Sequence, residues 1–230
     1  MNKDITITIT QNSEQIISAT ITQCGGQPAS EYLALIKLLS NQIRGELDAD
    51  AADIDLSIDD ALAYRTGITK LSSAATKTAA KFACTGCVAL AAVDLPALET
   101  IGDYAFARCA LTGEFLKSFP AAKSIGHSAF DRCNFESVDL SGVETIGART
   151  FRAQNIRKVW IPQGLKIAPE LGTVLDAPFI DNENVNIMIY TDCPDEATAA
   201  ANWGEYFDNI SAEQKAPVIY GATHDEYLQD

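Results

Sequence analysis

The sequence predicts an α/β-type repeat solenoid, in which repeats of about 22 residues each add one short strand to a continuous stack. Two observations predict this fold. Three segments in the middle of the chain match almost residue for residue: ETIGDYAFARC, KSIGHSAFDRC and ETIGARTFRAQ. Short runs of alternating apolar residues lie between these segments, and such runs are typical of one strand per repeat.

The phenylalanines of the three segments define the period of the repeat. Phe106, Phe130 and Phe151 are 24 and 21 residues apart, and a step of about 22 residues back from Phe106 reaches Cys84 in a more degenerate copy, AAKFACTGC. Each matching segment also has a glycine that permits a tight bend: Gly102, Gly126 and Gly147. One repeat cannot bury its apolar edge alone, so the repeats are expected to stack with the phenylalanine rings between them.

The alternating runs are the expected strands, and their inward residues are Leu90, Val93 and Leu95, then Phe135, Val138 and Leu140, then Ile156, Val159 and Ile161. The stretch CALTGEFLKSFP makes its repeat about two residues longer than its neighbours and places Lys117 near a position that is apolar elsewhere. An unpaired lysine in a stacked core costs several kcal/mol. We therefore expect a bulge or a shift of register there.

The segment before the repeats, residues 1–66, is expected to form an α+β cap. Residues 5–10 and 16–21 alternate β-branched and polar residues around a polar turn, which predicts a β-hairpin. Ser30 is placed to cap a helix that ends near Gly45. The acidic stretch that follows is interpreted as a solvated loop with an edge strand, since its spacing does not fit a calcium loop.

The charge composition of the chain limits the classes of partner that it can bind. Seventeen Lys and Arg against 31 Asp and Glu give a formal charge of -14, which repels nucleic acid and anionic membranes. No run approaches the roughly 18 apolar residues of a membrane span, and the first residues alternate apolar and polar instead of forming a signal peptide. We expect no nucleic-acid binding, no membrane insertion, and neither a signal peptide nor an anchor in this chain.

Cysteines at equivalent positions of successive repeats, Cys87, Cys109 and Cys133, are interpreted as a ladder of small buried thiols. Cys84 and Cys87 form a C-x-x-C pair, but no second C-x-x-C and no nearby histidine completes a redox or zinc site. A disulfide or a metal is the alternative left open.

Catalytic chemistry has few candidate residues. The chain has two histidines, His127 and His224, and neither lies in a motif with a nucleophile at a suggestive spacing. The sequence therefore predicts no catalytic residues, no metal site, no cofactor and no enzymatic activity.

The motifs I-G-x-x-A-F-x-x-C and L-x-x-V-x-L-P resemble the BspA-like subclass of leucine-rich repeats, which occurs in surface proteins of gut and oral bacteria and of some protists. The resemblance covers residues 68–162. It implies an α/β-type leucine-rich repeat solenoid over residues 67–185, a binding or adhesion function, and a location at the cell surface or outside the cell. Residues 186–210 resemble the end of such arrays, with a closing motif made by Trp203, Tyr206 and Phe207, which implies a C-terminal cap over residues 186–230.

A binding surface follows from the alternation of the strands. If the valines and leucines point inward, the residues that point outward or flank them on one face are Asp94, Ser118, Ser137, Asp139, Lys158 and Trp160. An outward tryptophan beside acidic and hydroxyl groups is typical of an interaction hot spot or a sugar-stacking position, although single exposed aromatics also occur on inert surfaces. Trp203, by contrast, is expected in the core.

The expected function is a non-enzymatic binding or adhesion module that recognises a protein or a glycan through this strand face. The alternative is a structural or assembly protein, such as a phage or prophage tail-associated component, and it is motivated by the polar hairpin at the start of the chain. It predicts self-assembly through residues 1–22. The oligomeric state and the ligand are left open by the sequence.

Overall fold

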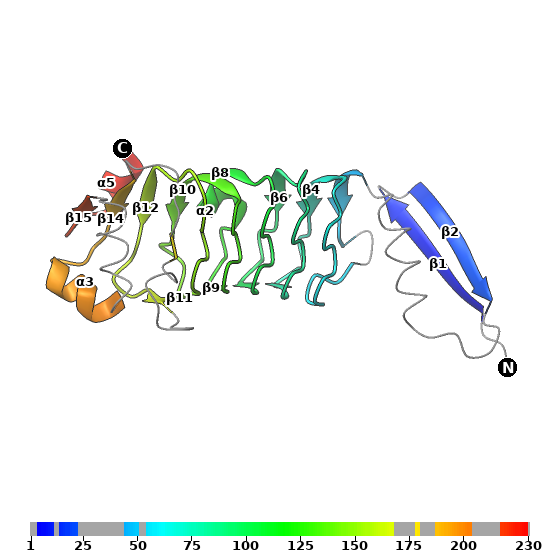
Figure 1. Ribbon diagram of the computed structural model, residues 1–230, viewed down its shortest axis with the longest axis horizontal. Helices are drawn as coiled ribbons and strands as arrows, with labels where there is room; N and C mark the ends of the chain where they lie inside the picture. Colours follow the sequence, from blue (N-terminus) through cyan, green and yellow to red (C-terminus); the bar gives the residue numbers. More distant parts are fainter. Residues whose placement is uncertain are drawn as a thin grey trace.

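The protein is a solenoid of parallel strands, and the computed structural model in Figure 1 is drawn with the long axis of the solenoid horizontal. The structure describes the backbone of residues 4–11 and 14–22, and then residues 44–50, 54–167, 178–179, 187–203 and 217–229. The helix expected after Ser30 and the closing-motif residues Tyr206 and Phe207 lie outside the described residues. The repeat solenoid with one short strand per turn on the strand side, predicted from the sequence, is confirmed.

One side of the solenoid, which we name the strand face, consists of two parallel sheets. The first contains β3 (Gly45–Asp48), β4 (Ile68–Ser72) and β6 (Ala92–Asp94). The second contains β8 (Thr112–Glu114), β10 (Asn134–Asp139), β12 (Lys158–Trp160), β14 (Met188–Tyr190) and β15 (Val218–Ile219). Val138 is in register with Val159, which is in register with Ile189, and all three are buried in the main core. The inward orientation of Val138 and Val159 is as expected.

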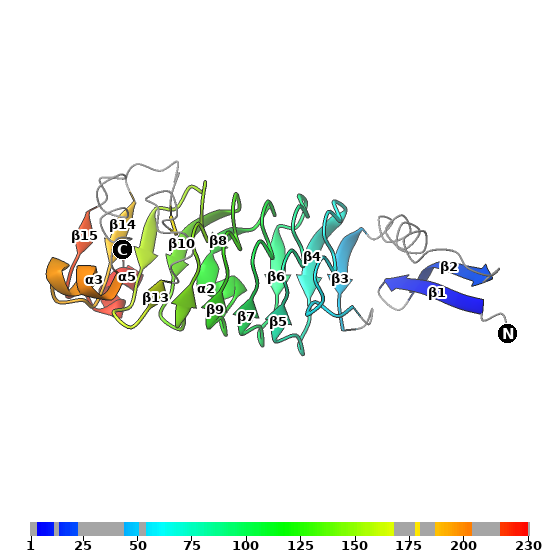
Figure 2. The same cartoon turned by 60° about the horizontal axis from the view of Figure 1, so that its bottom comes forward.

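The opposite side is a single five-stranded parallel sheet, which Figure 2 shows running along the solenoid. Its strands are β5 (Thr78–Ala79), β7 (Thr100–Ile101), β9 (Ser124–Ile125), β11 (Thr145–Ile146) and β13 (Lys166–Ile167). The repeat glycines follow these strands, where adjacent turns touch. A Cβ on Gly147 would lie 2.6 Å from the backbone nitrogen of His127. These glycines therefore permit close approach between turns.

Turn segments join the two sides, and each contains two residues with left-handed backbone, such as Ser128 and Arg132. Their backbone N–H groups bond to the next turn; the Phe130 nitrogen, for example, donates to the Thr150 oxygen at 2.9 Å. The phenylalanine rings stack from turn to turn, with centroids 5.7 Å apart for Phe106 and Phe130 and 5.5 Å apart for Phe130 and Phe151. The expected filling of the space between turns by phenylalanine is confirmed.

The cysteine ladder is also confirmed, and it has a specific hydrogen-bonding role. The Cys109 thiol donates to the carbonyl of Cys84 and the Cys133 thiol to the carbonyl of Phe106, both at 3.2 Å. Gln154, at the equivalent position of the next turn, donates through Nε2 to the Phe130 carbonyl at 2.6 Å. None of the cysteines that the structure describes forms a disulfide. In each of these turns a buried side chain thus donates a second hydrogen bond to a backbone carbonyl of the turn before it.

The long repeat breaks the strand face between β6 and β8. Its two extra residues form part of a single helical turn, α2 (Phe115–Ser118), and the pairing of β8 with β10 shifts register. Phe115 and Phe119 point into the core, while Lys117 is exposed and its Nζ lies 2.7 Å from Glu114 Oε1. The expected irregularity at Lys117 is confirmed.

Each end of the solenoid is followed by elements outside the repeats. The strands β1 (Asp4–Gln11) and β2 (Glu14–Thr22) pair as an antiparallel hairpin, as predicted. In the described residues near the C-terminus there are two helices, α3 (Glu196–Trp203) and α5 (His224–Gln229), and Trp203 is buried in the core as expected. Among the residues described here, no helix is long and apolar enough to cross a lipid bilayer.

Candidate functional site

The C-terminal helix α5 covers part of the strand face. Trp160 lies outside the main core, in a second small cluster with Tyr190 and Tyr227, but only 4% of its surface is exposed. Its ring centroid lies 5.1 Å from that of His224 and 6.1 Å from that of Tyr227. The strand alternation assigned the correct side of the sheet to Trp160, but the expectation that it is exposed is wrong, because the chain's own C-terminal segment packs on it.

Polar contacts fix α5 in this position. His224 Nε2 lies 2.6 Å from Asp139 Oδ2, and the Lys158 Nζ donates to the backbone oxygen of Tyr227 at 2.8 Å. The same ammonium lies 4.6 Å from the centroid of the Tyr227 ring, within the range of a cation–π interaction. Ser137 bonds to the Tyr227 side chain, and burial together with the nearby Asp139 carboxylate raises the pKa of that phenol. Four of the six expected binding residues therefore contact α5.

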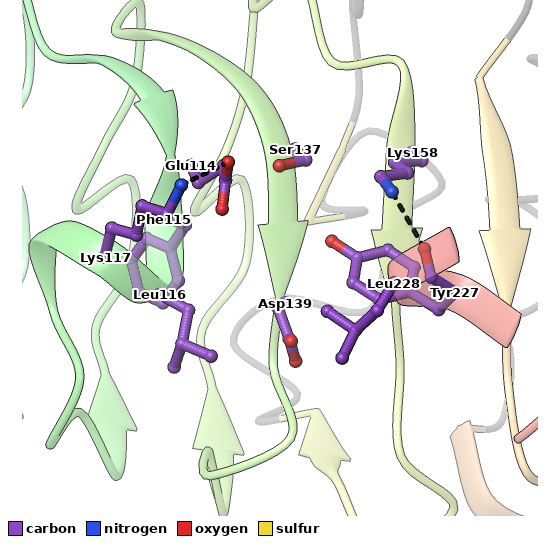
Figure 3. A pocket seen from close by; sticks show the side chains of 9 residues that line it. All are labelled: Glu114, Phe115, Leu116, Lys117, Ser137, Asp139, Lys158, Tyr227 and Leu228. Carbon is purple, nitrogen blue, oxygen red and sulfur yellow. Dashed lines mark hydrogen bonds and ion pairs between the residues drawn. The ribbon is translucent and has the colours of Figure 1, made fainter. Parts of the chain in front are cut away.

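A groove remains on the strand face between α2 and α5, above β10; we name it the β10 groove (Figure 3). It has a volume of about 290 Å³. Ser137 and Asp139 form its floor, α2 one wall and α5 the other (Figure 3). The residues that line it are Glu114, Phe115, Leu116, Lys117, Ser137, Asp139, Lys158, Tyr227 and Leu228.

The groove combines apolar walls with a polar floor. Leu228 is 59% exposed and forms part of the α5 wall, and Leu116 lies on the α2 wall. The floor carboxylate of Asp139 also accepts the backbone N–H of Ser141 at 2.9 Å. Hydroxyl, amine and carboxylate groups beside apolar and aromatic side chains suit a peptide side chain or a sugar.

The remaining expected residues lie outside the groove. Asp94 is exposed at the end of β6, on the other side of the break in the strand face. Ser118 is half-buried at the end of α2 and does not line the groove. Sequence reasoning brought together Ser137, Asp139 and Lys158 but missed the walls. The two-residue insertion signals the α2 wall, whereas the sequence carries no signal for the docking of α5.

Metal binding has no support from the geometry. Within the described part of the chain, no three His, Cys, Asp or Glu side chains gather as a metal site would require. In the acidic stretch, Asp50 Oδ2 instead accepts the backbone N–H of Ala74 at 2.7 Å and of Ala75 at 3.2 Å. These bonds and one from Ser73 lower the pKa of Asp50. The Asp50 carboxylate thus fixes the loop of residues 73–75 through hydrogen bonds.

Comparison with known proteins gives one match. Residues 77–170 match a family model described as a BspA type leucine rich repeat region, in 6 copies. No curated protein and no solved structure matches the chain.

Proposed function

Because residues 77–170 match a family model of BspA-type leucine-rich repeats, we propose that this chain is a non-enzymatic binding module of the adhesion type, which recognises a protein or a glycan through its strand face. Leucine-rich repeats generally mediate protein interactions, and BspA-like repeats are typically surface-associated. The location proposed for the module is accordingly the cell surface or the extracellular space.

The β10 groove is the proposed binding site. Ser137, Asp139 and Lys158 supply its polar groups, and Leu116 and Leu228 supply its apolar rims. The floor lies on paired parallel strands, so little ordering entropy is lost when a ligand binds. Trp160 is assigned a supporting role beneath α5, because its ring packs against Tyr227. Asp94 and Ser118 are proposed as outer contacts of a larger ligand.

The observation that carries this proposal is that both walls of the β10 groove, α2 and α5, are elements outside the regular repeat. The insertion that forms α2 and the C-terminal helix α5 both depart from the regular repeat, and both border the same stretch of β10. Departures of this kind on a repetitive scaffold are typical of a surface specialised for recognition.

Screening the full chain against arrays of glycans and of extracellular proteins tests the proposal, with Leu228→Asp as the groove variant. Leu228 is 59% exposed, so its replacement is expected to leave folding unchanged and to weaken binding of the captured ligand at least about ten-fold. Ile58→Asp is the matched control, because Ile58 is also 59% exposed but lies outside the groove. A ligand that both variants bind equally well would contradict the groove as the site.

An assembly function is a second candidate, favoured by the N-terminal hairpin. Among the described strands, β1 and β2 pair only with each other, so each has an open edge. Isolated two-stranded hairpins are marginally stable, and open edges favour pairing with another chain. Light scattering on the full chain and on a deletion of residues 1–22 separates the candidates. An oligomer that dissociates on deletion favours assembly, and a monomer in both cases favours the binding module.

A further inference from the structure

A second surface lies along one end of the turn segments, away from the β10 groove. The second left-handed position of four successive turns holds Tyr64, Gly86, Arg108 and Arg132, with φ between 57° and 69°. The backbone N–H of each donates to the next turn, as from Arg108 to the Asp131 oxygen at 2.7 Å. The four residues are therefore successive rungs, about 4.8 Å apart as in a β ladder. We name this row, together with Val88 and Asn134, the arginine edge.

Exposed apolar groups occupy one end of the arginine edge. Tyr64 is 64% exposed and Val88 is 58% exposed. The Tyr64 ring rests against Gly86, where an added Cβ would lie 2.5 Å from Tyr64 Cδ1, so the glycine makes room for the ring. Packing does not account for so exposed a ring. At the opposite end of the same turn segments, Phe82 and Tyr104 stack 5.2 Å apart, so each covers a face of the other.

Guanidinium groups occupy the other end of the arginine edge. Arg108 and Arg132 are exposed on adjacent rungs, and Arg108 pairs with no carboxylate among the described residues. Asp131 lies 4.0 Å from Arg132 Nε and 3.8 Å from Arg152 Nη1. Asp131 thus lies beside Arg132 and Arg152, and Arg108 lies one rung away from Arg132. The exposed guanidinium groups of Arg108 and Arg132, on adjacent rungs, favour an anionic ligand.

A shallow hollow of about 490 Å³ adjoins these arginines. It is lined by Arg132, Cys133, Asn134, Ala153 and Gln154. The Cys133 thiol and both polar atoms of the Gln154 amide are bound to backbone groups, so they are not available to a ligand. The hollow therefore offers the Arg132 guanidinium and the Asn134 amide, two planar groups that suit carboxylate and hydroxyl oxygens.

We propose that the arginine edge binds an acidic oligosaccharide, with sugar carboxylates on Arg108 and Arg132 and a sugar ring against Tyr64. Guanidinium groups bind carboxylates in a bidentate manner, and aromatic rings pack on the apolar face of a sugar. A rung spacing close to the length of one sugar ring lets successive sugars meet successive rungs. This site lies outside the β10 groove and does not depend on the function proposed for it.

An acidic peptide is disfavoured by the backbone of the arginine edge. Extended peptides commonly add to a protein through main-chain hydrogen bonds. Here the N–H groups of Tyr64, Gly86, Arg108 and Arg132 are all used between turns. Recognition therefore depends on side chains, and a sugar acid supplies both carboxylate and hydroxyl groups to them.

Titration calorimetry with tetragalacturonate tests the proposal, because its methyl ester has the same sugar backbone without the charges. The acid is expected to bind, the ester to bind at least about ten-fold more weakly, and added salt to weaken the binding of the acid. No binding of the acid, or equal binding of the ester, would overturn the proposal. So would competition by polyglutamate at the same carboxylate concentration, which would assign the arginine edge to acidic protein segments.

Substitutions in the arginine edge test whether the acidic oligosaccharide binds there. The double substitution Arg108→Gln with Arg132→Gln is expected to weaken binding at least about ten-fold, and Tyr64→Asn several-fold, because asparagine tolerates the left-handed backbone while removing the ring. Lys77→Gln with Lys166→Gln is the matched control, since it removes two exposed charges on the opposite side. The proposal fails if the control pair loses as much affinity as the arginine pair, with thermal unfolding used to show that both are folded.

Discussion

The two sheet sides of the solenoid respond differently to the same irregular repeat. The sheet from β5 to β13 continues through five strands without a break, whereas the strand face is divided between β6 and β8. Both sides receive the same long repeat, yet only one changes. The two-residue insertion therefore interrupts the strand face and leaves the opposite sheet continuous.

Contact between backbones explains this difference. On the continuous side, a Cβ at Gly126 would lie 2.7 Å from the nitrogen of Asp103, and one at Gly147 would lie 2.6 Å from the nitrogen of His127. Backbones this close leave no room for extra residues. On the strand face, α2 moves Lys117 outward into solvent while Phe115 and Phe119 remain in the core. The extra residues are accommodated on the strand face, where they can be exposed to solvent, and there α2 forms one wall of the β10 groove.

The largest expected effect is on the ring stack that both sides share. Phe130 contacts Phe106, Phe119 and Phe151, with ring centroids 5.7, 5.0 and 5.5 Å away. Phe130→Ala is expected to lower the free energy of unfolding by about 4 kcal/mol in urea denaturation, because the cavity cannot close. Phe82→Ala, at a half-buried ring outside this stack, is expected to cost less than half as much. Equal losses would show that the stack does not organise the core.

Gly147→Ala tests the close approach on the continuous side. The added methyl group overlaps backbone that cannot move independently of the ladder, so we expect a loss of about 3 kcal/mol in the free energy of unfolding. Gly164→Ala is the control, since nothing lies within 4 Å of its Cβ position. If the two variants were equally stable, close approach would not explain why the insertion avoids this side.

Gln154 tests the ladder of buried donors. Gln154→Leu removes the donor to the Phe130 carbonyl and the acceptor for the Phe135 N–H, which lies 3.1 Å from Oε1. The Phe135 N–H is then left unpaired and the Phe130 carbonyl keeps only the Cys133 N–H as a donor, at 3.1 Å, which is expected to cost about 2 kcal/mol. Gln154→Cys restores a thiol donor as in the turns before it, so its loss in thermal or urea unfolding should be smaller. A leucine variant as stable as the cysteine variant would contradict this role.

Sequence periodicity predicted the parts of the fold that repeat. The spacing of Phe106, Phe130 and Phe151 predicted the stack, and the equivalence of Cys109 and Cys133 predicted buried thiols, because identical turns place identical residues in identical surroundings. That Gln154 continues the ladder was not predicted, since its chemical likeness to cysteine lies only in the donated hydrogen bond.

Contacts between segments distant in the chain could not be predicted in this way. Period-two alternation assigned Asp139 and Trp160 to the outer side of their strands, and both do lie there. Their burial depends on His224 and Tyr227, which follow them by more than 60 residues and have no periodic relation to them. For the same reason, the sequence indicated an irregularity at Lys117 without indicating that it faces α5 across a groove.

Stability at alkaline pH is expected to depend on the thiol ladder. Burial raises the pKa of Cys87 from its usual value of 9.0 to about 11. In the unfolded chain this thiol loses its proton near pH 9, so between pH 9 and 11 the folded state binds more protons and stability falls as pH rises. The expected loss is about 1 kcal/mol between pH 8 and 10. Urea unfolding under reducing conditions should show a smaller loss for Cys87→Ser, and equal losses would contradict the assignment to this thiol.

The smallest expected effect concerns Lys117, on the wall formed by the insertion. Its ion pair with Glu114 is exposed on both sides, and such pairs contribute about 0 to 1 kcal/mol. Lys117→Ala should therefore change the free energy of unfolding by less than about 0.5 kcal/mol, measured beside Phe115→Ala, which empties a buried site in the same helical turn and should cost several times more. A large loss for Lys117→Ala would mean that the ion pair holds α2 in place. A small loss means that the buried rings hold it, and that the groove wall can change its charge without affecting the fold.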